Sequence, residues 1–260
     1  MICPLCSRST EKLFYKTDDL ILYKCSCGFV FHNQQTEYND QYSIEFAKTR
    51  KFMYPDRAEC LRDIVQRIRK YKPAGNLLDI GCGDGHFLSY AKDYYDISGI
   101  EPSYDLSVHA SKILSIPVVH GYYPADLKNT QKSDIITMIQ VMEHIPNPVK
   151  ILEHIYNNLS QGGLVVIEIP SISAPHFLLY RLTGIKRFVN NPYGIIKNHV
   201  GYYSPKRFLS LMNSIGFKKI ELTTGRWQVK YKGTLKSIAK IIDPVFNMLR
   251  IGGILYIGTK

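Results

Sequence analysis

The chain has 260 residues, 45% of them hydrophobic and 21% charged, a balance typical of a globular protein that buries a core. It contains no apolar run of the roughly 20 residues that a membrane-spanning helix needs, and no basic-then-apolar secretory signal at its start. We therefore expect a cytoplasmic protein whose six cysteines are reduced or bound to metal rather than paired in a disulfide scaffold.

The net charge of +11 is concentrated in the last third of the chain. Residues 171–260 hold 15 Lys and Arg against 2 Asp and Glu, whereas residues 73–170 hold 5 against 11. A basic segment of this kind attracts phosphate groups, whether on a nucleotide, a lipid head group or RNA. We expect an anionic partner.

The first 40 residues carry two short cysteine pairs, CPLC (Cys3, Cys6) and CSC (Cys25, Cys27). Two pairs of thiolates on tight turns suit the tetrahedral site of a zinc ribbon. The second pair has one intervening residue where two are usual, so His32 remains an alternative to one of its thiolates. Because four protein ligands leave no open position, the predicted zinc is structural.

After a predicted helical extension over residues 41–72, short apolar runs alternate with amphipathic stretches. Runs that are apolar throughout, alternating with helices, predict a parallel sheet covered on both faces. A later helix is predicted to begin after Ser204 and to end at Gly216. We expect strands at residues 76–80, 97–101, 117–121, 134–140 and 164–170, and two closing strands at 218–224 and 253–260.

The first of these strands runs directly into a glycine-rich turn, LLDIGCGDGHFL. A strand, a glycine turn and a helix together form a site for a nucleotide-like ligand. Asp79 and Asp84 would repel a pyrophosphate and favour a positively charged ligand. Glu101 ends the second strand, where an acidic side chain can accept hydrogen bonds from both ribose hydroxyls. These residues predict a ligand with a ribose and a positive charge but no phosphate.

The segments LLDIGCGDGHFL, GIEPS, VMEHIPNPVKILEHIYNNLSQGGLVVIEIP and HVGYYSPKRFLSLMNSIGF resemble, in this order, the motifs of class I S-adenosylmethionine-dependent methyltransferases. The ubiquinone-biosynthesis-like and sugar-methylating branch is the most similar, over roughly residues 50–225. The resemblance implies an α/β fold with a Rossmann-like, seven-stranded, mostly parallel sheet over residues 73–260, whose last strand runs against its neighbours. It also implies that S-adenosyl-L-methionine is held by Asp79, Gly81, Gly83 and Glu101. Further candidates for this cofactor site are Cys82, Tyr122 and Gln140.

Two positions depart from the family's pattern. Tyr122 stands where relatives often have an acid that meets the adenine amino group, and Asp126 lies farther along than that acid. Gln140 replaces a carboxylate that helps the ubiquinone-type enzymes hold a divalent cation. A neutral amide is a weaker ligand, so we do not expect a catalytic magnesium site.

Catalytic candidates follow the fourth strand, where Glu143 and His144 are adjacent. Methyl transfer needs an aligned acceptor and often a base that removes its proton. His144 has a suitable pKa for this base, and Glu143 could orient it. The alternative, that the pair only caps the following helix and supports the cofactor, stays open. His199 matches a histidine that is common near the acceptor site in the resembling family.

Residues 171–203 form a long insertion after the fifth strand, which we predict to be a substrate lid. Its arginines would suit a diphosphate, since guanidinium groups bind phosphate oxygens in pairs. Packing of the lid against the sheet is the alternative role for its aromatic residues. The candidate substrate residues are His176, Tyr180, Arg181, Arg187 and Tyr202.

The leading hypothesis is a methyltransferase acting on a small anionic metabolite, such as a nucleotide-linked sugar or a glycan or lipid precursor. An RNA methyltransferase that uses the zinc ribbon and the basic last third is an alternative. A non-catalytic cofactor-binding interaction protein is another. The basic amphipathic stretch at residues 231–250 is expected to pack in the core, and peripheral contact with an anionic membrane is its alternative.

Overall fold

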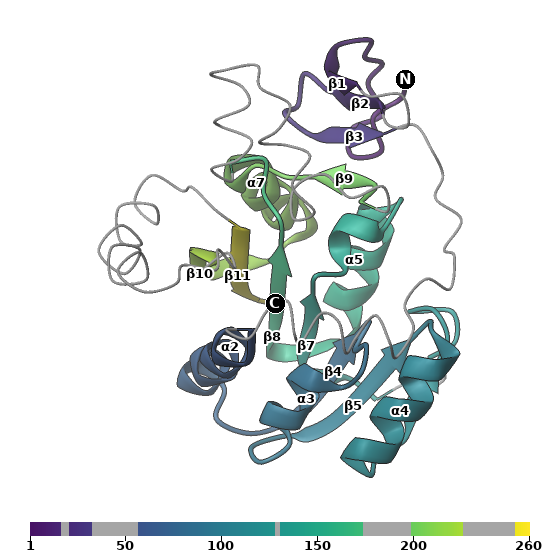
Figure 1. Cartoon of the computed structure of the whole chain (residues 1–260). Helices are drawn as coiled ribbons and strands as arrows, with labels where there is room; N and C mark the ends of the chain where they lie inside the picture. The colour runs from purple at the N-terminus through teal and green to yellow at the C-terminus, as the bar shows by residue number, and fades with distance from the viewer. Residues whose placement is uncertain (17–20, 33–56, 128–130, 174–198, 226–252) are drawn as a thin grey trace, which may run out of the picture.

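The computed structural model describes residues 1–16, 21–32, 57–127, 131–173, 199–225 and 253–260 (Figure 1). Its main strands are β4 (Asn76–Ile80), β5 (Asp96–Glu101), β6 (Val118–His120), β7 (Ser133–Ile139), β8 (Leu159–Ile169), β10 (Lys218–Gly225) and β11 (Gly253–Thr259). Within the described ranges these seven strands form one sheet in the order β10–β11–β8–β7–β4–β5–β6. The predicted strands are therefore present, with ends that differ by a few residues.

Strand β4 is central to the parallel part of this sheet. It pairs in parallel with β5 and β7, which pair in parallel with β6 and β8. Strand β11 is antiparallel to both β8 and β10, which confirms that the last strand runs against its neighbours. Because the chain continues to β5 on one side of β4 and later to β7 on the other, a ligand site is expected beyond the carboxyl ends of these strands.

Helices cover both faces of the sheet, and the alternation of side chains along β4 shows how. Leu77 packs in the cluster that includes helix residues 61–68, 87–91 and 110–114, whereas Leu78 packs with helix residues of the other face. The predicted helical extension is described from Arg57 onward; residues 33–56 lie outside the described ranges. The helices are α2 (Arg57–Tyr71), α3 (His86–Ala91), α4 (Tyr104–Leu114), α5 (Pro148–Asn158) and α7 (Pro205–Ile215).

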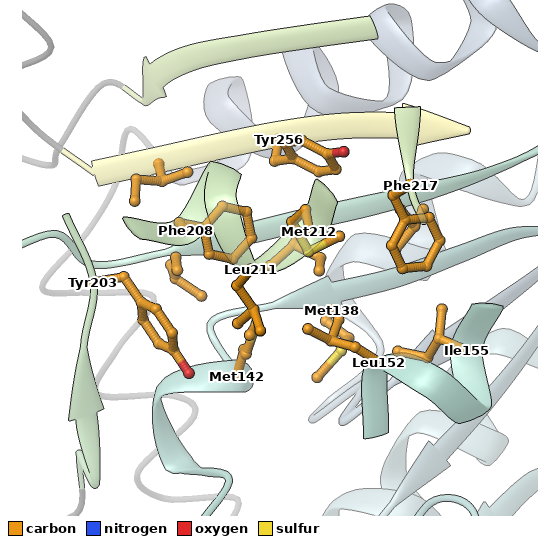
Figure 2. Packing of buried hydrophobic residues seen from close by; sticks show 14 of the residues in the cluster. Met138, Met142, Leu152, Ile155, Tyr203, Phe208, Leu211, Met212, Phe217 and Tyr256 are labelled. Atoms are coloured by element: carbon orange, nitrogen blue, oxygen red, sulfur yellow. The ribbon is translucent and has the colours of Figure 1, made fainter. Parts of the chain in front are cut away.

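Helix α7 has the ends that its sequence predicts. The Ser204 side chain accepts a hydrogen bond from the Arg207 N–H at 3.2 Å, and Gly216 ends the helix with a φ of 114°. Its buried face joins the core on the side of α5. Figure 2 shows Phe208, Leu211 and Met212 among Met138, Met142, Leu152, Tyr203 and Tyr256.

The N-terminal segment forms a second, smaller sheet with a strand from far along the chain. In the described residues, β1 (Leu13–Lys16), β2 (Ile21–Lys24) and β3 (Val30–His32) pair antiparallel, and β3 also pairs with β9 (Gly201–Tyr202). We call residues 1–16 and 21–32 the cysteine ribbon. Figure 1 shows it, in purple, next to β9 and α7.

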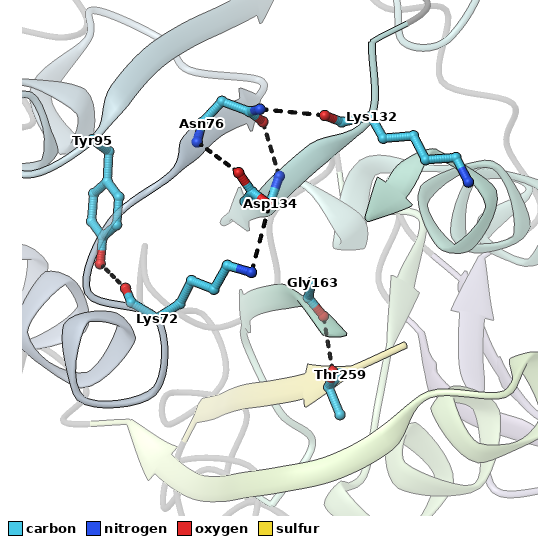
Figure 3. A network of polar contacts seen from close by, with 7 residues as sticks. All are labelled: Lys72, Asn76, Tyr95, Lys132, Asp134, Gly163 and Thr259. Carbon is cyan, nitrogen blue, oxygen red and sulfur yellow. Dashed lines mark hydrogen bonds and ion pairs between the residues drawn. The ribbon is translucent and has the colours of Figure 1, made fainter. Parts of the chain in front are cut away.

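The amino ends of the central strands are joined by a network of polar contacts (Figure 3). The Asn76 N–H donates to Oδ2 of Asp134 at 3.1 Å, and the Asp134 N–H donates back to Oδ1 of Asn76 at 2.9 Å. Lys72 places Nζ 3.5 Å from Oδ1 of Asp134, and the Tyr95 hydroxyl donates to the Lys72 carbonyl at 2.7 Å. These contacts align β4 with β7.

None of the helices in the described ranges has both the length and the apolar character to cross a lipid bilayer.

Candidate cofactor and acceptor site

The glycine turn after β4 is held close to β5 by its own backbone. The N–H groups of Gly81 and Cys82 both donate to the Ile100 carbonyl, at 2.8 and 3.2 Å. Gly81 and Gly83 have φ angles of 70° and 57°, a backbone region that favours glycine. A Cβ on Gly81 would overlap Val141, whereas a Cβ on Gly83 would meet nothing within 4 Å. The turn therefore presents open backbone at Gly83, as close approach by a ligand requires.

Cys82 is predicted to contact the cofactor, but its side chain packs against β5. Its thiol is buried and packs against Gly99, where an added Cβ would lie 2.8 Å from Sγ. Burial raises the pKa of this thiol well above its ordinary value, and the neighbouring Asp79 and Glu101 carboxylates raise it further. Its backbone, rather than its side chain, is the part that a ligand in the turn could reach.

Two buried carboxylates lie beside this turn. Glu101 accepts the Gly83 N–H at Oε2, 2.8 Å away, and the Ser103 N–H at Oε1, 2.9 Å away. Asp79 accepts the Thr137 hydroxyl at 2.6 Å. Burial raises the pKa of Asp79 to about 7, the Glu101 charge raises it as well, and the Thr137 hydrogen bond opposes both.

This pair of carboxylates fits a cationic nucleoside. Carboxylates withdrawn from water are stabilised by an opposite charge, and one that lacks such a charge retains its proton up to a higher pH. A ligand with an ammonium and a sulfonium group supplies the missing positive charge. The hydrogen bonds of Glu101 to Gly83 and Ser103 hold its carboxylate at the end of β5, where a ribose would lie.

At the end of β6, Asp126 lies beside Tyr122. It folds back and accepts the Tyr122 N–H at Oδ2, 2.8 Å away. It packs so closely on Gly121 that an added Cβ there would overlap it. The Tyr122 side chain is half exposed. The Asp126 carboxylate therefore lies next to Tyr122, the residue predicted to meet the adenine.

Gln140, at the end of β7, has a φ of 60°, which is unusual for a residue with a side chain. Its N–H donates to the Glu168 carbonyl at 2.8 Å, and its Nε2 is buried without a hydrogen-bond partner among the described residues. Strained backbone and an unused amide at a strand end are typical of functional sites. The strained backbone and the unpaired amide are both consistent with the predicted location of Gln140, at the sheet edge where the cofactor would bind.

Arg57 and Glu168 form a buried ion pair next to this strand end, and sequence analysis missed it. The guanidinium donates to both carboxylate oxygens, at 2.8 and 2.6 Å, between the start of α2 and the end of β8. Burial lowers the pKa of Arg57, but the charge and hydrogen bonds of Glu168 raise it overall, with a smaller contribution from Glu143. One signal was available: Glu168 is the single charged residue in the apolar run LVVIEIP.

The candidate catalytic residues come together from two distant segments. The turn η1 (Met142–His144) carries Glu143 and His144, and the Val200 N–H donates to the Glu143 carbonyl at 2.8 Å. Nε2 of His199 lies 4.0 Å from Oε1 of Glu143, and the His199 ring meets the His144 ring edge-on at 4.7 Å. Ligand atoms of all three lie within 4.8 Å of one another, so they could also hold an ion.

Burial separates the roles that these three side chains can take. Glu143 and His199 are almost fully buried, at 1% and 5% exposure, whereas His144 is partly exposed. Burial lowers the pKa of His199 well below its ordinary value, and charges on His144 and His32 lower it further. His199 is therefore neutral near pH 7. His144 is the member of the group that an acceptor can reach.

The predicted substrate residues are mostly outside the described ranges. Tyr202 is described, and it is fully buried against the cysteine ribbon, in a cluster with Tyr15, Leu22 and Val30. Its contact with an acceptor stays a prediction. The predicted residues and segments that lie outside are His176, Tyr180, Arg181, Arg187 and the stretch 231–250.

The four predicted metal ligands are assembled at one point of the cysteine ribbon. The thiol sulfurs of Cys3, Cys6, Cys25 and Cys27 lie within 4.8 Å of one another, with Sγ–Sγ distances of 3.8 Å (Cys3–Cys27) and 3.5 Å (Cys6–Cys25). Hydrogen bonds from the Cys27 backbone and the other thiols lower the pKa of Cys25 to about 7, although burial opposes this. His32 is not in this group. Its backbone N–H donates to the Val200 carbonyl at 3.3 Å.

Comparison with known proteins adds independent evidence. A family model described as a methyltransferase domain matches residues 53–222. The chain is 28% identical over 137 residues to a dTDP-3-amino-3,4,6-trideoxy-alpha-D-glucopyranose N,N-dimethyltransferase of Streptomyces venezuelae, covering 49% of this chain and 58% of that protein. It is 25% identical over 153 residues to a ubiquinone biosynthesis O-methyltransferase of Colwellia psychrerythraea, covering 56% and 61%.

The chain thus spans less than two thirds of the length of these curated relatives. Among solved structures, it is similar to an S-adenosylmethionine-dependent methyltransferase of Thermotoga maritima that its authors describe as a possible histamine N-methyltransferase. The TM-score is 0.59 at 18% identity, with 84% of this chain and 95% of that chain covered. At this identity the likeness supports the fold alone.

Proposed function

Since the chain belongs to the methyltransferase-domain family, we propose that it transfers a methyl group from S-adenosylmethionine to a small anionic acceptor. The observation that carries this proposal is the pair of buried carboxylates, Asp79 and Glu101, beside the open glycine turn. A ligand that brings positive charge and ribose hydroxyls together would suit both carboxylates. A dinucleotide would instead bring a pyrophosphate to the same carboxylates.

Each part of the cofactor has a candidate partner. Glu101 would accept the ribose hydroxyls, and the backbone around Gly83 would lie along the methionine part. Asp79 would complement the positive charge, since it lies behind the turn with its pKa raised to about 7 by burial. Asp126 and Tyr122, joined by their 2.8 Å hydrogen bond, are candidates for the adenine end.

The chain's own task in the reaction is to align the acceptor and take up its proton. When bound, the sulfonium supplies a methyl group already activated for in-line displacement. His144 is the partly exposed base that would receive the proton from an acceptor hydroxyl or amine, as the acceptor's bond to the methyl carbon forms and the bond from that carbon to sulfur breaks. His199 and Glu143, buried behind it, would hold the imidazole in place and limit water in the site.

Calorimetry on the purified chain tests the cofactor. We expect S-adenosylhomocysteine, the demethylated product, to bind, and NAD to bind weakly or not at all. The affinity for S-adenosylhomocysteine should also rise between pH 6 and pH 8, because its ammonium group binds best when Asp79 has lost its proton. Tight NAD binding together with no response to S-adenosylhomocysteine would overturn the proposal.

We infer that the acceptor is a nucleotide-linked sugar or a related glycan or lipid precursor. The support is the excess of Lys and Arg in residues 171–260, together with similarity to a protein named for a dTDP-sugar substrate. Incubation of cell extract with radiolabelled S-adenosylmethionine, before and after nuclease treatment, tests this. Label in small, nuclease-resistant anionic products is the expected result. Label lost from large molecules on ribonuclease treatment would favour RNA instead.

We also propose that the four cysteines bind a structural zinc ion. A tetrahedral site with Zn–S bonds of about 2.3 Å has sulfur–sulfur edges of about 3.8 Å, and the Cys6–Cys25 and Cys3–Cys27 pairs lie at 3.5 and 3.8 Å. Elemental analysis should find stoichiometric zinc, which Cys6→Ser should reduce. Cys60→Ser, in α2 and outside the group, is the matched control. Full zinc content in Cys6→Ser would contradict the assignment.

A further inference from the structure

The short segment from His199 to Tyr203 is held between the cysteine ribbon and the catalytic turn. On one side, β9 pairs with β3, with Val30 opposite Tyr202 and Phe31 opposite Gly201. On the other side, the Val200 N–H donates to the Glu143 carbonyl at 2.8 Å. Tyr203 also forms an isolated β-bridge with Ser171, shortly after β8, and its carbonyl accepts the Ile172 N–H at 3.1 Å.

Side-chain packing strengthens the ribbon side of this arrangement. The Phe29 ring lies 4.8 Å from the Tyr203 ring and stacks on Phe31 at 5.9 Å. Gly201 is where the two segments approach most closely, because an added Cβ there would overlap the Phe29 ring. Its φ is not positive, so the absence of a side chain at this position serves the contact with Phe29 rather than the backbone.

Hydrogen bonds of Cys25 fix the turn that precedes Phe29. The Cys25 N–H donates to the Phe29 carbonyl at 2.9 Å, and the Gly28 N–H donates to the Cys25 carbonyl at 2.9 Å. Phe29 thus follows directly on a tight turn whose two thiols, Cys25 and Cys27, lie in the metal-ligand group. Cys3, Cys25 and Phe29 share one hydrophobic cluster with Met142, the first residue of the catalytic turn.

We propose that Phe29 of the cysteine ribbon is a positioning residue, acting through Gly201 to set His199 against Glu143 and His144. The inference builds on the proposed methyl transfer and on metal binding by the four cysteines. A metal bound to the four cysteines would fix the ribbon, and the ribbon would fix β9 by pairing with it. Because His199 lies two residues before β9, the position of its imidazole would follow. Loss of this contact would slow methyl transfer while leaving the Glu101 side of the site intact.

A size exchange between Gly201 and Phe29 tests the contact. Gly201→Ala introduces the overlap with Phe29, and we expect kcat to fall about tenfold or more because small displacements of catalytic groups have large effects. Affinity for S-adenosylhomocysteine and zinc content should stay at the wild-type level. The double variant Gly201→Ala/Phe29→Leu, with a smaller side chain opposite the new methyl group, should recover much of the lost kcat.

Gly258→Ala is the matched control, because its Cβ would overlap the hydroxyl of Tyr256 in β11, away from the ribbon. We expect it to lower the melting temperature without a selective loss of kcat. A Gly201→Ala protein with wild-type kcat, or a double variant that regains stability but not kcat, would overturn the inference. If Gly201→Ala does not fold, Phe29→Leu alone must lower kcat at unchanged cofactor affinity, and wild-type kcat in that variant would also overturn the inference.

Nitrogen NMR of the histidine side chains gives a readout that does not depend on turnover. In ligand-free protein, Gly201→Ala should shift the signals of His199, and the double variant should restore them. His109, in α4, should not respond. Because no cofactor or acceptor is present, unmoved His199 signals would refute the positioning role, whereas failure to bind S-adenosylhomocysteine would refute only the proposed function.

Discussion

The polar groups at the two ends of the parallel sheet differ in how completely other residues balance them. At the amino ends of β4 and β7, Asn76 and Asp134 exchange hydrogen bonds and Lys72 adds a positive charge (Figure 3). At the carboxyl ends, Asp79 is buried with a pKa raised to about 7 and Gln140 has a φ of 60°. The polar groups of the amino end are balanced by one another, whereas at the carboxyl end Asp79 lacks a positive partner and Nε2 of Gln140 lacks a hydrogen-bond acceptor among the described residues.

This difference separates residues that hold the fold from residues that serve a ligand. Substitutions at a fully paired end remove stabilising contacts and have no reason to affect binding. Substitutions at the carboxyl end remove groups whose burial is unfavourable without a ligand, so they can impair function and yet leave stability unchanged or higher. The two ends of the same strands therefore predict opposite relations between stability and activity.

The largest effect is expected at His144, the partly exposed member of the catalytic group. His144→Gln should lower kcat by about 10²- to 10⁴-fold, the usual contribution of a general base, with little change in cofactor affinity. His154→Gln, on the exposed face of α5, is the control. Single-turnover kinetics with a labelled acceptor checks this. Wild-type kcat in His144→Gln would show that His144 is not the base.

Asp79→Asn should raise stability and weaken cofactor binding together. The pKa of Asp79 is raised from its ordinary value of 3.8 to about 7, so the native state binds more protons than the unfolded state between these values. The free energy of unfolding therefore falls as pH rises from about 4 to about 7. Near pH 4, burial of the carboxyl group costs little stability because the group keeps its proton. At pH 8 the substitution should stabilise the ligand-free protein by about 2–4 kcal/mol.

Urea unfolding at pH 8 and at pH 5 measures this change, and the stabilisation should shrink at the lower pH. Calorimetry on the same samples should show weaker binding of S-adenosylhomocysteine. A less stable Asp79→Asn protein at pH 8 would mean that the carboxylate is already balanced within the chain, and the contrast between the two ends of the sheet would fail.

Glu101→Ala should weaken binding of S-adenosylhomocysteine by about 10- to 100-fold, since hydrogen bonds to a charged group contribute roughly 1.5–3 kcal/mol. The loss has two sources: the ribose partner, and the support that Glu101 gives to the Gly83 and Ser103 N–H groups. Glu101→Gln keeps part of that support and should have an intermediate effect. Glu153→Ala, exposed on α5, should bind normally. Unchanged affinity in Glu101→Ala would refute its role.

Sequence analysis predicted the sheet well because its determinants are local. Each strand is a short apolar run, and Ser204 and Gly216 carry the end signals of α7 in their own side chains or backbone. The glycine turn and Glu101 were predictable for the same reason, since the turn directly follows β4 and Glu101 is the last residue of β5. Position along the chain was sufficient to place them at one edge of the sheet.

Contacts between distant segments were not predictable in this way. The pairing of β3 with β9 and the ion pair of Arg57 with Glu168 join residues more than 100 positions apart, and no periodicity signals either. Asp126 was set aside on sequence distance, although a turn brings it back to Tyr122. The sequence supported a metal site at the cysteines, but not the contact of the cysteine ribbon with the segment that carries His199.

The smallest effect is expected at the amino end of the sheet. Asp134→Ala should lower the free energy of unfolding by about 1–2 kcal/mol, because the Asn76 N–H loses its acceptor and Lys72 loses its partner. The carboxylate is partly exposed, so water replaces some of what is lost. Affinity for S-adenosylhomocysteine and kcat should not change, as thermal unfolding, calorimetry and kinetics on one preparation can show. A loss of cofactor affinity as large as that of Glu101→Ala would mean that alignment of β4 with β7 sets the site's geometry, and the two ends could no longer be treated as independent.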